Sequence, residues 1–186
     1  MTAKKIQDLQ TAIGVEPDGF WGPKSIAACQ RHLRKLMPLT HPWPKSDQKS
    51  LTAFYGAAGD ESRHTQISVA GLGLLYEGAA VARITCHEQV GPSLLRVLKR
   101  LSTRHPEVLA DFAGCYNHRP MRGGTQPSLH ARAAAVDFMP GSNGNRSAWP
   151  VASSMPLGAM EEFAREGWLP AGAFWGRDSM HFQATQ

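Results

Sequence analysis

The chain has 186 residues, which is enough for one catalytic domain with its own hydrophobic core and a small additional segment. Hydrophobic residues make up 42% of it and charged residues 19%, as is ordinary for a soluble globular protein. No stretch approaches the roughly 20 apolar residues that span a bilayer, so stable membrane insertion is not expected.

The formal net charge of +5 favours anionic partners such as nucleic acid, an anionic membrane surface or the bacterial wall. No basic run with interleaved aromatic residues and no strong nucleic-acid motif occurs, so nucleic acid is not the expected partner. The first ten residues hold two lysines without an apolar run, which does not fit a secretory signal peptide. The three widely spaced cysteines form no Cys-x-x-Cys pair, which argues against a disulfide framework or a cysteine zinc knuckle. We expect buried, unpaired side chains at Cys29, Cys86 and Cys115.

The residue pattern of the first segment, residues 1–38, predicts two helices on either side of a tight turn. Apolar residues recur at helical spacing from Ile6 to Ile13, and Gly14 is placed to end that helix. A turn rich in Gly and Pro follows over residues 17–23, and a second helix is expected from Pro23 to about Leu36. Residues 39–46 follow Pro38 and contain two further prolines, so they are expected to form an extended linker.

The remaining residues, 47–186, predict an α+β domain: a small mixed or antiparallel sheet flanked by helices, without regular βαβ alternation. The apolar patterns, read in chain order, give the following elements. We expect a short helix over 47–55, a hairpin of strands 65–76 and 79–86, an amphipathic helix over 91–104, strands over 109–116 and 134–139, a helix over 157–166 and a last strand over 179–183.

Two short motifs carry the candidate chemistry. His130 precedes Asp137 by seven residues in a run of small apolar residues, and Asp178 precedes His181 by three residues next to an apolar strand. An aspartate in an apolar strand is costly unless it is paired or bound to a metal. Two imidazoles and one carboxylate suit a catalytic zinc, and the second carboxylate suits a general base. The spacing alone does not decide which aspartate has which role, and polar groups satisfied within strands are the alternative.

The pattern Ser-x-His-x-x-x-x-Ala-x-Asp, from Ser128 to Asp137, is followed downstream by Asp-x-x-His-Phe. Together they resemble the zinc peptidases of the VanX/VanY type, which comprise D-alanyl-D-alanine carboxypeptidases and dipeptidases and phage L-alanyl-D-glutamate endopeptidases. The similarity extends over about residues 54–183. It implies a fold of the hedgehog or D-Ala-D-Ala peptidase type for the catalytic domain.

The resemblance also implies a role for each motif residue. His130, Asp137 and His181 would bind one Zn²⁺ per chain, and Asp178 would be the catalytic base. Arg119 would bind substrate or stabilise charge in the transition state, and Ser128 would support the loop that carries the first ligand.

The chain departs from the family pattern at two positions. Ala133 stands where the family often has Gly, and we expect little harm from a residue so small. Asp178 stands where many members have Glu, which is closer to the phage endopeptidase branch than to the dipeptidase branch. Glu88 is the next candidate base if Asp178 points away from the metal. His118, Arg119 and Arg122 lie in a loop just upstream of the motif that begins at Ser128, where arginines usually face solvent, although one of them could hold a substrate carboxylate. No motif role falls to His32, His41, His64, His87 or His105. His87 lies near a candidate site strand, and we expect a structural role for it.

The turn Asp18-Gly-Phe-Trp-Gly-Pro-Lys-Ser25 resembles the core repeat of the peptidoglycan-binding helical domain, over about residues 6–36. The resemblance makes Asp18, Trp21 and Lys24 candidate wall-binding residues. The alternative is a helical cap with a purely structural role.

Both resemblances point to bacterial peptidoglycan as the partner, and we expect a monomeric peptidoglycan hydrolase that acts like an endolysin. The expected reaction is cleavage of the L-alanyl-D-glutamate bond of the stem peptide. A D-alanyl-D-alanine carboxypeptidase or D,D-endopeptidase is the alternative enzyme, and a non-catalytic wall-binding module is the alternative of another class. The small size, the basic charge and the lack of a signal peptide suit a phage protein. It would accumulate in the host cytoplasm and reach the wall through a separate membrane lesion.

Overall fold

The computed structural model describes residues 2–121 and 123–186, and it has an α+β fold. The chain begins with α1 (Ala3–Ala12) and α2 (Pro23–Leu36), in agreement with the predicted pair of helices. The side chain of Gln10 lies at the centre of the turn between them. Its amide nitrogen donates to Oδ1 of Asp18 at 2.6 Å and to Oγ of Ser25 at 3.0 Å.

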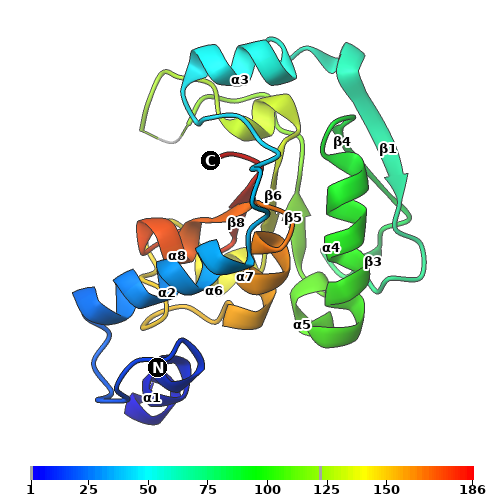
Figure 1. Ribbon diagram of the computed structural model, residues 1–186. Helices are drawn as coiled ribbons and strands as arrows, with labels where there is room; N and C mark the ends of the chain where they lie inside the picture. The colour runs from blue at the N-terminus through cyan, green and yellow to red at the C-terminus, as the bar shows by residue number, and fades with distance from the viewer. Residues whose placement is uncertain (1, 122) are drawn as a thin grey trace.

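α2 packs against the helices α7 (Leu157–Ala164) and α8 (Ala171–Trp175), and Ala28, Cys29 and Leu33 of α2 belong to the main hydrophobic core. Figure 1 shows α1 at the edge of the molecule and α2 lying along α7 and α8.

The predicted linker, residues 39–46, has no helix or strand, but it is anchored to the core at Trp43. The indole N–H of Trp43 donates to the backbone carbonyl of Glu166 at 2.9 Å, and its ring packs edge-on against Trp168. The division of the chain into a helical segment, a linker and a catalytic domain at residues 38 and 46 remains a prediction.

The segment after the linker forms α3 (Gln48–Tyr55), the 3₁₀ turn η1 (Glu61–Arg63) and the predicted hairpin. The first predicted strand, over 65–76, is not continuous, because the turn at 69–74 divides the hairpin into two small antiparallel sheets. One pairs β1 (His64–Ser68) with β4 (Arg83–His87), and the other pairs β2 (Leu75–Tyr76) with β3 (Ala79–Ala80).

The amphipathic helix is confirmed as α4 (Gly91–Arg104). The strand predicted over 109–116 is wrong at its start, because the short helix α5 (Pro106–Leu109) precedes a strand that covers only Phe112–Gly114, β5. Pro106 can begin a helix, since its missing N–H is not needed in the first turn.

The central sheet is antiparallel in the order β5–β6–β8–β7, with β6 (Ala135–Phe138) and β8 (His181–Gln183) in the middle. Val136, Phe138 and Phe182 are fully buried and pack into the aromatic core with α7. Besides η1 and α5, the elements that the sequence did not predict are the 3₁₀ turn η2 (Leu129–Arg132), α6 (Pro140–Asn143), β7 (Leu169–Pro170) and α8, all of them short.

Across the described residues, no helix combines the length and the apolar character that crossing a membrane requires.

Candidate metal centre

Three side-chain atoms converge at the middle of the central sheet. Nε2 of His130, Oδ1 of Asp137 and Nδ1 of His181 lie 2.9 to 3.2 Å from one another, and all three side chains are buried. Ligand atoms about 2.0 to 2.1 Å from a tetrahedral zinc are separated by about 3.3 Å. The separations are therefore close to those of three ligands around one small cation, and these residues form the one such group found among the described residues.

His130 is presented by the 3₁₀ turn η2. Ser128 caps this turn, because its Oγ accepts a hydrogen bond from the backbone N–H of His130 at 3.3 Å. After the turn, Ala133 adopts a left-handed conformation with φ of 52°, which turns the chain into β6. The turn thus brings His130 within hydrogen-bonding distance of Asp137, although seven residues separate them.

His181 reaches the same point from the neighbouring strand, because it is the direct partner of Asp137 in the register of β6 and β8. Gln183 lies two residues further along β8, so its side chain points to the same face of the sheet as His181. Its amide oxygen accepts a hydrogen bond from Nε2 of His181 at 3.2 Å, and its amide nitrogen donates to Thr185 at 2.6 Å.

The hydrogen bonds at the outer edges of the two rings select their tautomers. Nδ1 of His130 donates to the backbone carbonyl of Cys115 at 2.7 Å, as Nε2 of His181 donates to Gln183. Each neutral ring then directs a lone pair toward Asp137, whose oxygen is also an acceptor. Three acceptors that face one another fit a metal cation, and outer N–H groups held by a carbonyl or amide are typical of metal-binding histidines. The residues present therefore fit a zinc ion.

The charges within the group are strongly coupled. Without a metal, a ring N–H can point inward instead. Burial then opposes ionisation of Asp137, but hydrogen bonds from the rings of His130 and His181 outweigh burial and hold the pKa of Asp137 below the usual range. Burial lowers the pKa of His181, but the hydrogen bond to the Asp137 carboxylate outweighs it and raises that pKa above its usual value. Asp137 therefore brings a negative charge into a buried site, where a cation would compensate it.

The group opens into a cleft of about 240 Å³ that also contains Asp178 and Arg119. Asp178 is half-buried and has φ of 58°, and its backbone carbonyl accepts a hydrogen bond from the N–H of His181 at 2.9 Å. The backbone carbonyl of Arg119 accepts a hydrogen bond from Ser128 at 3.1 Å, which ties the arginine loop to the turn that carries His130. The structure thus brings together the three candidate ligands, the candidate base, the candidate substrate arginine and the supporting serine.

Other candidates lie elsewhere. Glu88 does not line the cleft and instead forms an ion pair with Arg63 at 2.9 Å. His87 is buried and bonds to the carbonyl of Tyr55, so the structural role expected for it is confirmed. His118 is exposed next to Gly59 and does not line the cleft, and Arg122 lies outside the described residues.

The three candidate wall-binding residues differ in their contacts and in their exposure to solvent. Asp18 holds the turn together through Gln10 and the backbone N–H of Phe20. Trp21 is half-buried, with its ring edge-on to Trp149 at 5.3 Å, and Lys24 is exposed.

Three further residues at the cleft were missed by the sequence analysis. Trp175 stacks on the His181 ring at a centroid distance of 5.7 Å and is 47% exposed, while Arg177 and Gln183 line the cleft beside it. Strand alternation from His181 was a signal for Gln183. Trp175 sits in a helix of five residues, which is too short to give a periodic pattern.

The cysteines are buried and unpaired, as expected. Comparisons of the chain with protein-family models, with curated proteins and with solved structures found no match.

Proposed function

We propose that this protein is a zinc-dependent peptidase that cleaves amide bonds in the stem peptides of bacterial peptidoglycan. The observation that carries the proposal is the convergence of His130, Asp137 and His181, whose outer ring nitrogens are engaged so that three acceptor atoms face one point. The sequence resemblance to the VanX/VanY-type peptidases supports the choice of reaction, and a fold of that type remains part of the proposal.

Zinc held by these three residues would act as a Lewis acid for the scissile carbonyl and lower the pKa of a water molecule. The carboxylate of Asp178 would take the proton of the attacking water and deliver it to the leaving amine. The Arg119 guanidinium would bind a carboxylate or the developing negative charge of the substrate. Trp175, exposed at the cleft and stacked on His181, would restrict the ring of that ligand and contact the substrate.

Within the stem peptide, we propose the L-alanyl-D-glutamate bond as the site of cleavage. The support is the sequence: the base is Asp rather than Glu, as in the phage branch of the resembling family. The setting that follows is phage lysis, in which the enzyme reaches the wall from the host cytoplasm through a separate membrane lesion.

The test is mass spectrometry of purified muropeptides digested with the zinc-loaded protein. Fragments with a new N-terminal D-glutamate support the proposed bond. Released D-alanine supports a carboxypeptidase and refutes the endopeptidase. Muropeptides that remain intact with the zinc-loaded wild type, while it still binds walls, refute the enzyme and leave a wall-binding module.

A further inference from the structure

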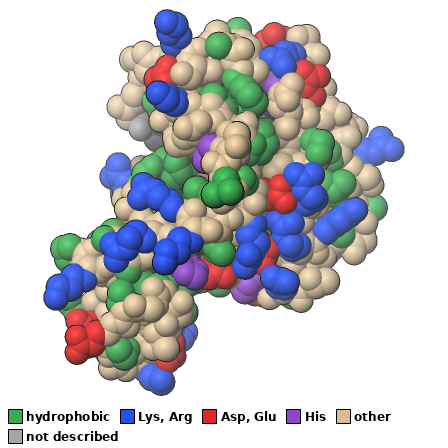
Figure 2. All heavy atoms as spheres, in the orientation of Figure 1, with side chains coloured by type: hydrophobic (Ala, Val, Ile, Leu, Met, Phe, Trp, Pro, Cys, Tyr) green, Lys and Arg blue, Asp and Glu red, His purple; other side chains and the backbone are tan. Residues whose placement is uncertain are grey.

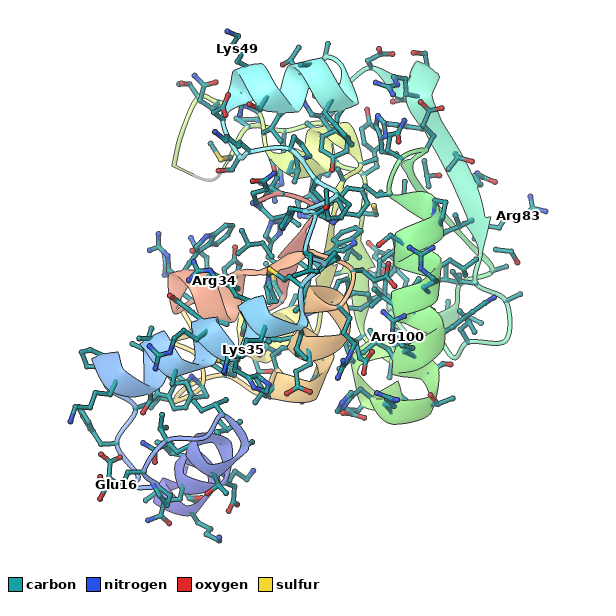
Figure 3. All side chains as sticks on the ribbon, in the orientation of Figure 1. Glu16, Arg34, Lys35, Lys49, Arg83 and Arg100 are labelled. Atoms are coloured by element: carbon teal, nitrogen blue, oxygen red, sulfur yellow. The ribbon has the colours of Figure 1, made fainter. Side chains whose placement is uncertain are left out.

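One face of the molecule carries many Lys and Arg side chains (Figure 2). Figure 2 shows Lys and Arg side chains in a band across this view, and Figure 3 places Lys35 on α2 and Arg100 on α4 along it. α7 lies between these helices, since it contacts both, and His32 of α2 bonds to Glu161 of α7 at 2.7 Å. We call this surface the basic face. Its charged members are Arg31, Arg34, Lys35, Arg96, Lys99, Arg100, Arg104, Glu161, Glu162, Arg165 and Glu166.

The basic face holds eight cationic side chains and three carboxylates, an excess of five charges. This excess equals the formal net charge of +5 of the whole chain, so the other Lys, Arg, Asp and Glu residues cancel one another. An excess of this size over three neighbouring helices gives a positive field over this face.

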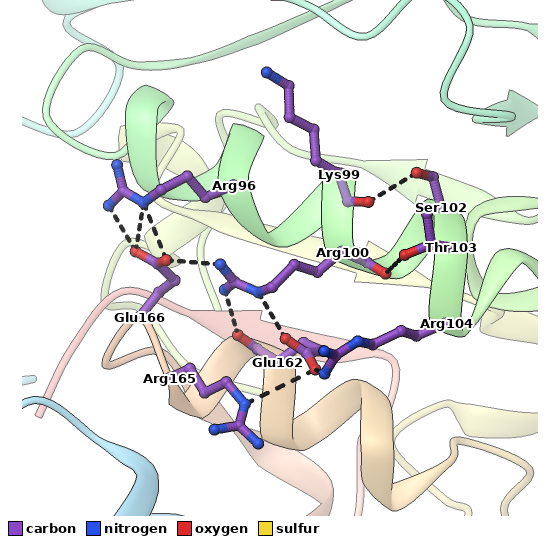
Figure 4. A network of polar contacts seen from close by, with 9 residues as sticks. All are labelled: Arg96, Lys99, Arg100, Ser102, Thr103, Arg104, Glu162, Arg165 and Glu166. Atoms are coloured by element: carbon purple, nitrogen blue, oxygen red, sulfur yellow. Dashed lines mark hydrogen bonds and ion pairs between the residues drawn. The ribbon is translucent and has the colours of Figure 1, made fainter.

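Two glutamates fix the arginines of the basic face in place (Figure 4). Glu162 has a side chain only 3% exposed and accepts hydrogen bonds from Arg100 at 2.6 Å and from Arg104 at 2.7 Å. Glu166 accepts three hydrogen bonds from Nε and Nη2 of Arg96, the shortest at 2.6 Å, and one from Arg100 at 3.1 Å. Arg165 lies 3.8 Å from Glu162.

The network leaves positive charge unbalanced at the surface, because four guanidinium groups share two carboxylates. The side chains of Arg96 and Arg104 are more than half exposed, so part of each guanidinium still faces solvent. Arginines already held in position lose less rotamer freedom when they bind an anion. A guanidinium with free N–H groups recognises phosphate through paired hydrogen bonds.

We propose that the basic face binds a phosphodiester-linked anionic polymer of the bacterial wall. The band runs along three helices rather than into a pocket, which suits a chain of repeated phosphates better than one small anion. No member of the face lines the metal cleft, so a bound polymer leaves that cleft open. Within the described residues, α2, α4 and α7 expose no aromatic side chain on which nucleic-acid bases could stack. The choice of a wall polymer rests on the proposed function.

Two double variants with equal changes in charge test the proposal. The face variant carries Lys35→Glu and Lys99→Glu. Among the described residues neither lysine forms an ion pair, so the arginine–glutamate network stays intact. The control carries Lys49→Glu and Arg83→Glu, which are exposed on α3 and β4, away from the basic face (Figure 3). Thermal unfolding of both variants verifies that they fold.

Binding of the full chain is measured by sedimentation with purified walls over a range of salt concentrations. The walls are used intact or after hydrofluoric acid has removed their phosphodiester-linked polymers, and duplex DNA serves as a competitor. The wild type should bind intact walls at least about tenfold more tightly than extracted walls, with a steep salt dependence. The face variant should lose about tenfold or more in affinity for intact walls, and the control less than about twofold.

Equal binding to intact and extracted walls, or equal losses in the two variants, would overturn the proposal. Displacement by duplex DNA at lower phosphate concentrations than by the released polymer would assign the face to nucleic acid instead. Hydrolysis of a soluble stem peptide is measured in parallel, because it requires the metal cleft and not the basic face. Loss of wall binding with retained hydrolysis, or the reverse, therefore separates this proposal from the proposed function.

Discussion

Nε2 of His130 and Nδ1 of His181 lie 3.1 Å apart, and each ring donates its opposite N–H to an oxygen that fixes its orientation. One of those oxygens belongs to a backbone carbonyl and cannot be removed by mutation. The other belongs to Gln183, so the orientation of His181 can be tested directly.

Gln183→Ala should weaken zinc binding by about 10- to 100-fold, because His181 loses the acceptor that selects its tautomer. Competition with a chromogenic chelator measures the affinity. Gln66→Ala, at an exposed position on β1, is the matched control and should leave the affinity unchanged. An unchanged affinity in the Gln183 variant would mean that this hydrogen bond does not orient the ligand.

Asp178→Asn should lower kcat for stem-peptide hydrolysis by about 10² to 10⁴, as expected for the loss of a general base. Its zinc content should stay that of the wild type, because Asp178 is not one of the three converging ligands. Asp111→Asn is the control, since Asp111 is exposed and does not line the cleft. A fully active Asp178 variant would remove this residue from the mechanism.

Ala133 and Ala135 are both fully buried, but Ala133 has φ of 52° whereas Ala135 lies in the strand β6. In both, replacement by Gly removes a buried methyl group worth about 0.8 kcal/mol and costs about 0.5 to 1 kcal/mol of backbone entropy. At Ala133 this loss is offset by relief of about 1 to 2 kcal/mol of left-handed strain. Ala133→Gly should therefore leave the free energy of unfolding within about 0.5 kcal/mol of wild type, while Ala135→Gly lowers it by about 1 to 2 kcal/mol. Chemical denaturation measures both, and equal losses would contradict the explanation.

Glu166 gives a prediction about pH. Burial opposes its ionisation, but hydrogen bonds from Arg96 and Arg100 outweigh burial and hold its pKa below the usual value. A lowered pKa in the folded state means that the ionised carboxylate stabilises the fold above the unfolded pKa of about 4.3, and that this stability is lost as the pH falls through the folded value.

Glu166→Gln should therefore reduce the free energy of unfolding by about 1 to 2 kcal/mol at pH 7, and the difference should shrink as the pH falls from about 5 to about 3. Thermal unfolding across this pH range measures it. Glu77→Gln, at an exposed position, should show no such dependence. A difference between wild type and Glu166→Gln that stays constant with pH would exclude the ion pairs as its source.

The sequence predicted the helices well where a long apolar pattern exists, as in α2 and α4, and it predicted which residues form the candidate metal centre. It did not predict how they approach. The register that places His181 opposite Asp137 joins residues 44 positions apart, and such pairing is decided by packing of the whole sheet rather than by local pattern. The left-handed conformation of Ala133 carries no signal in a run of alanines, because alanine rarely adopts it.

The strands were less predictable than the helices for the same reason. The hairpin predicted over 65–86 breaks at the turn of residues 69–74, where Val69 and Leu74 are buried although they lie outside the strands. The apolar character of this turn comes from packing into the core, and a pattern of alternation cannot distinguish it from a strand.

Isothermal titration of the metal-free protein with zinc tests the central claim most directly. The wild type should bind about one zinc per chain, and His181→Ala should lose that binding. A wild type that binds no zinc, or a His181→Ala variant that binds it with the same stoichiometry and affinity, would contradict the assignment of His130, Asp137 and His181 as the metal centre.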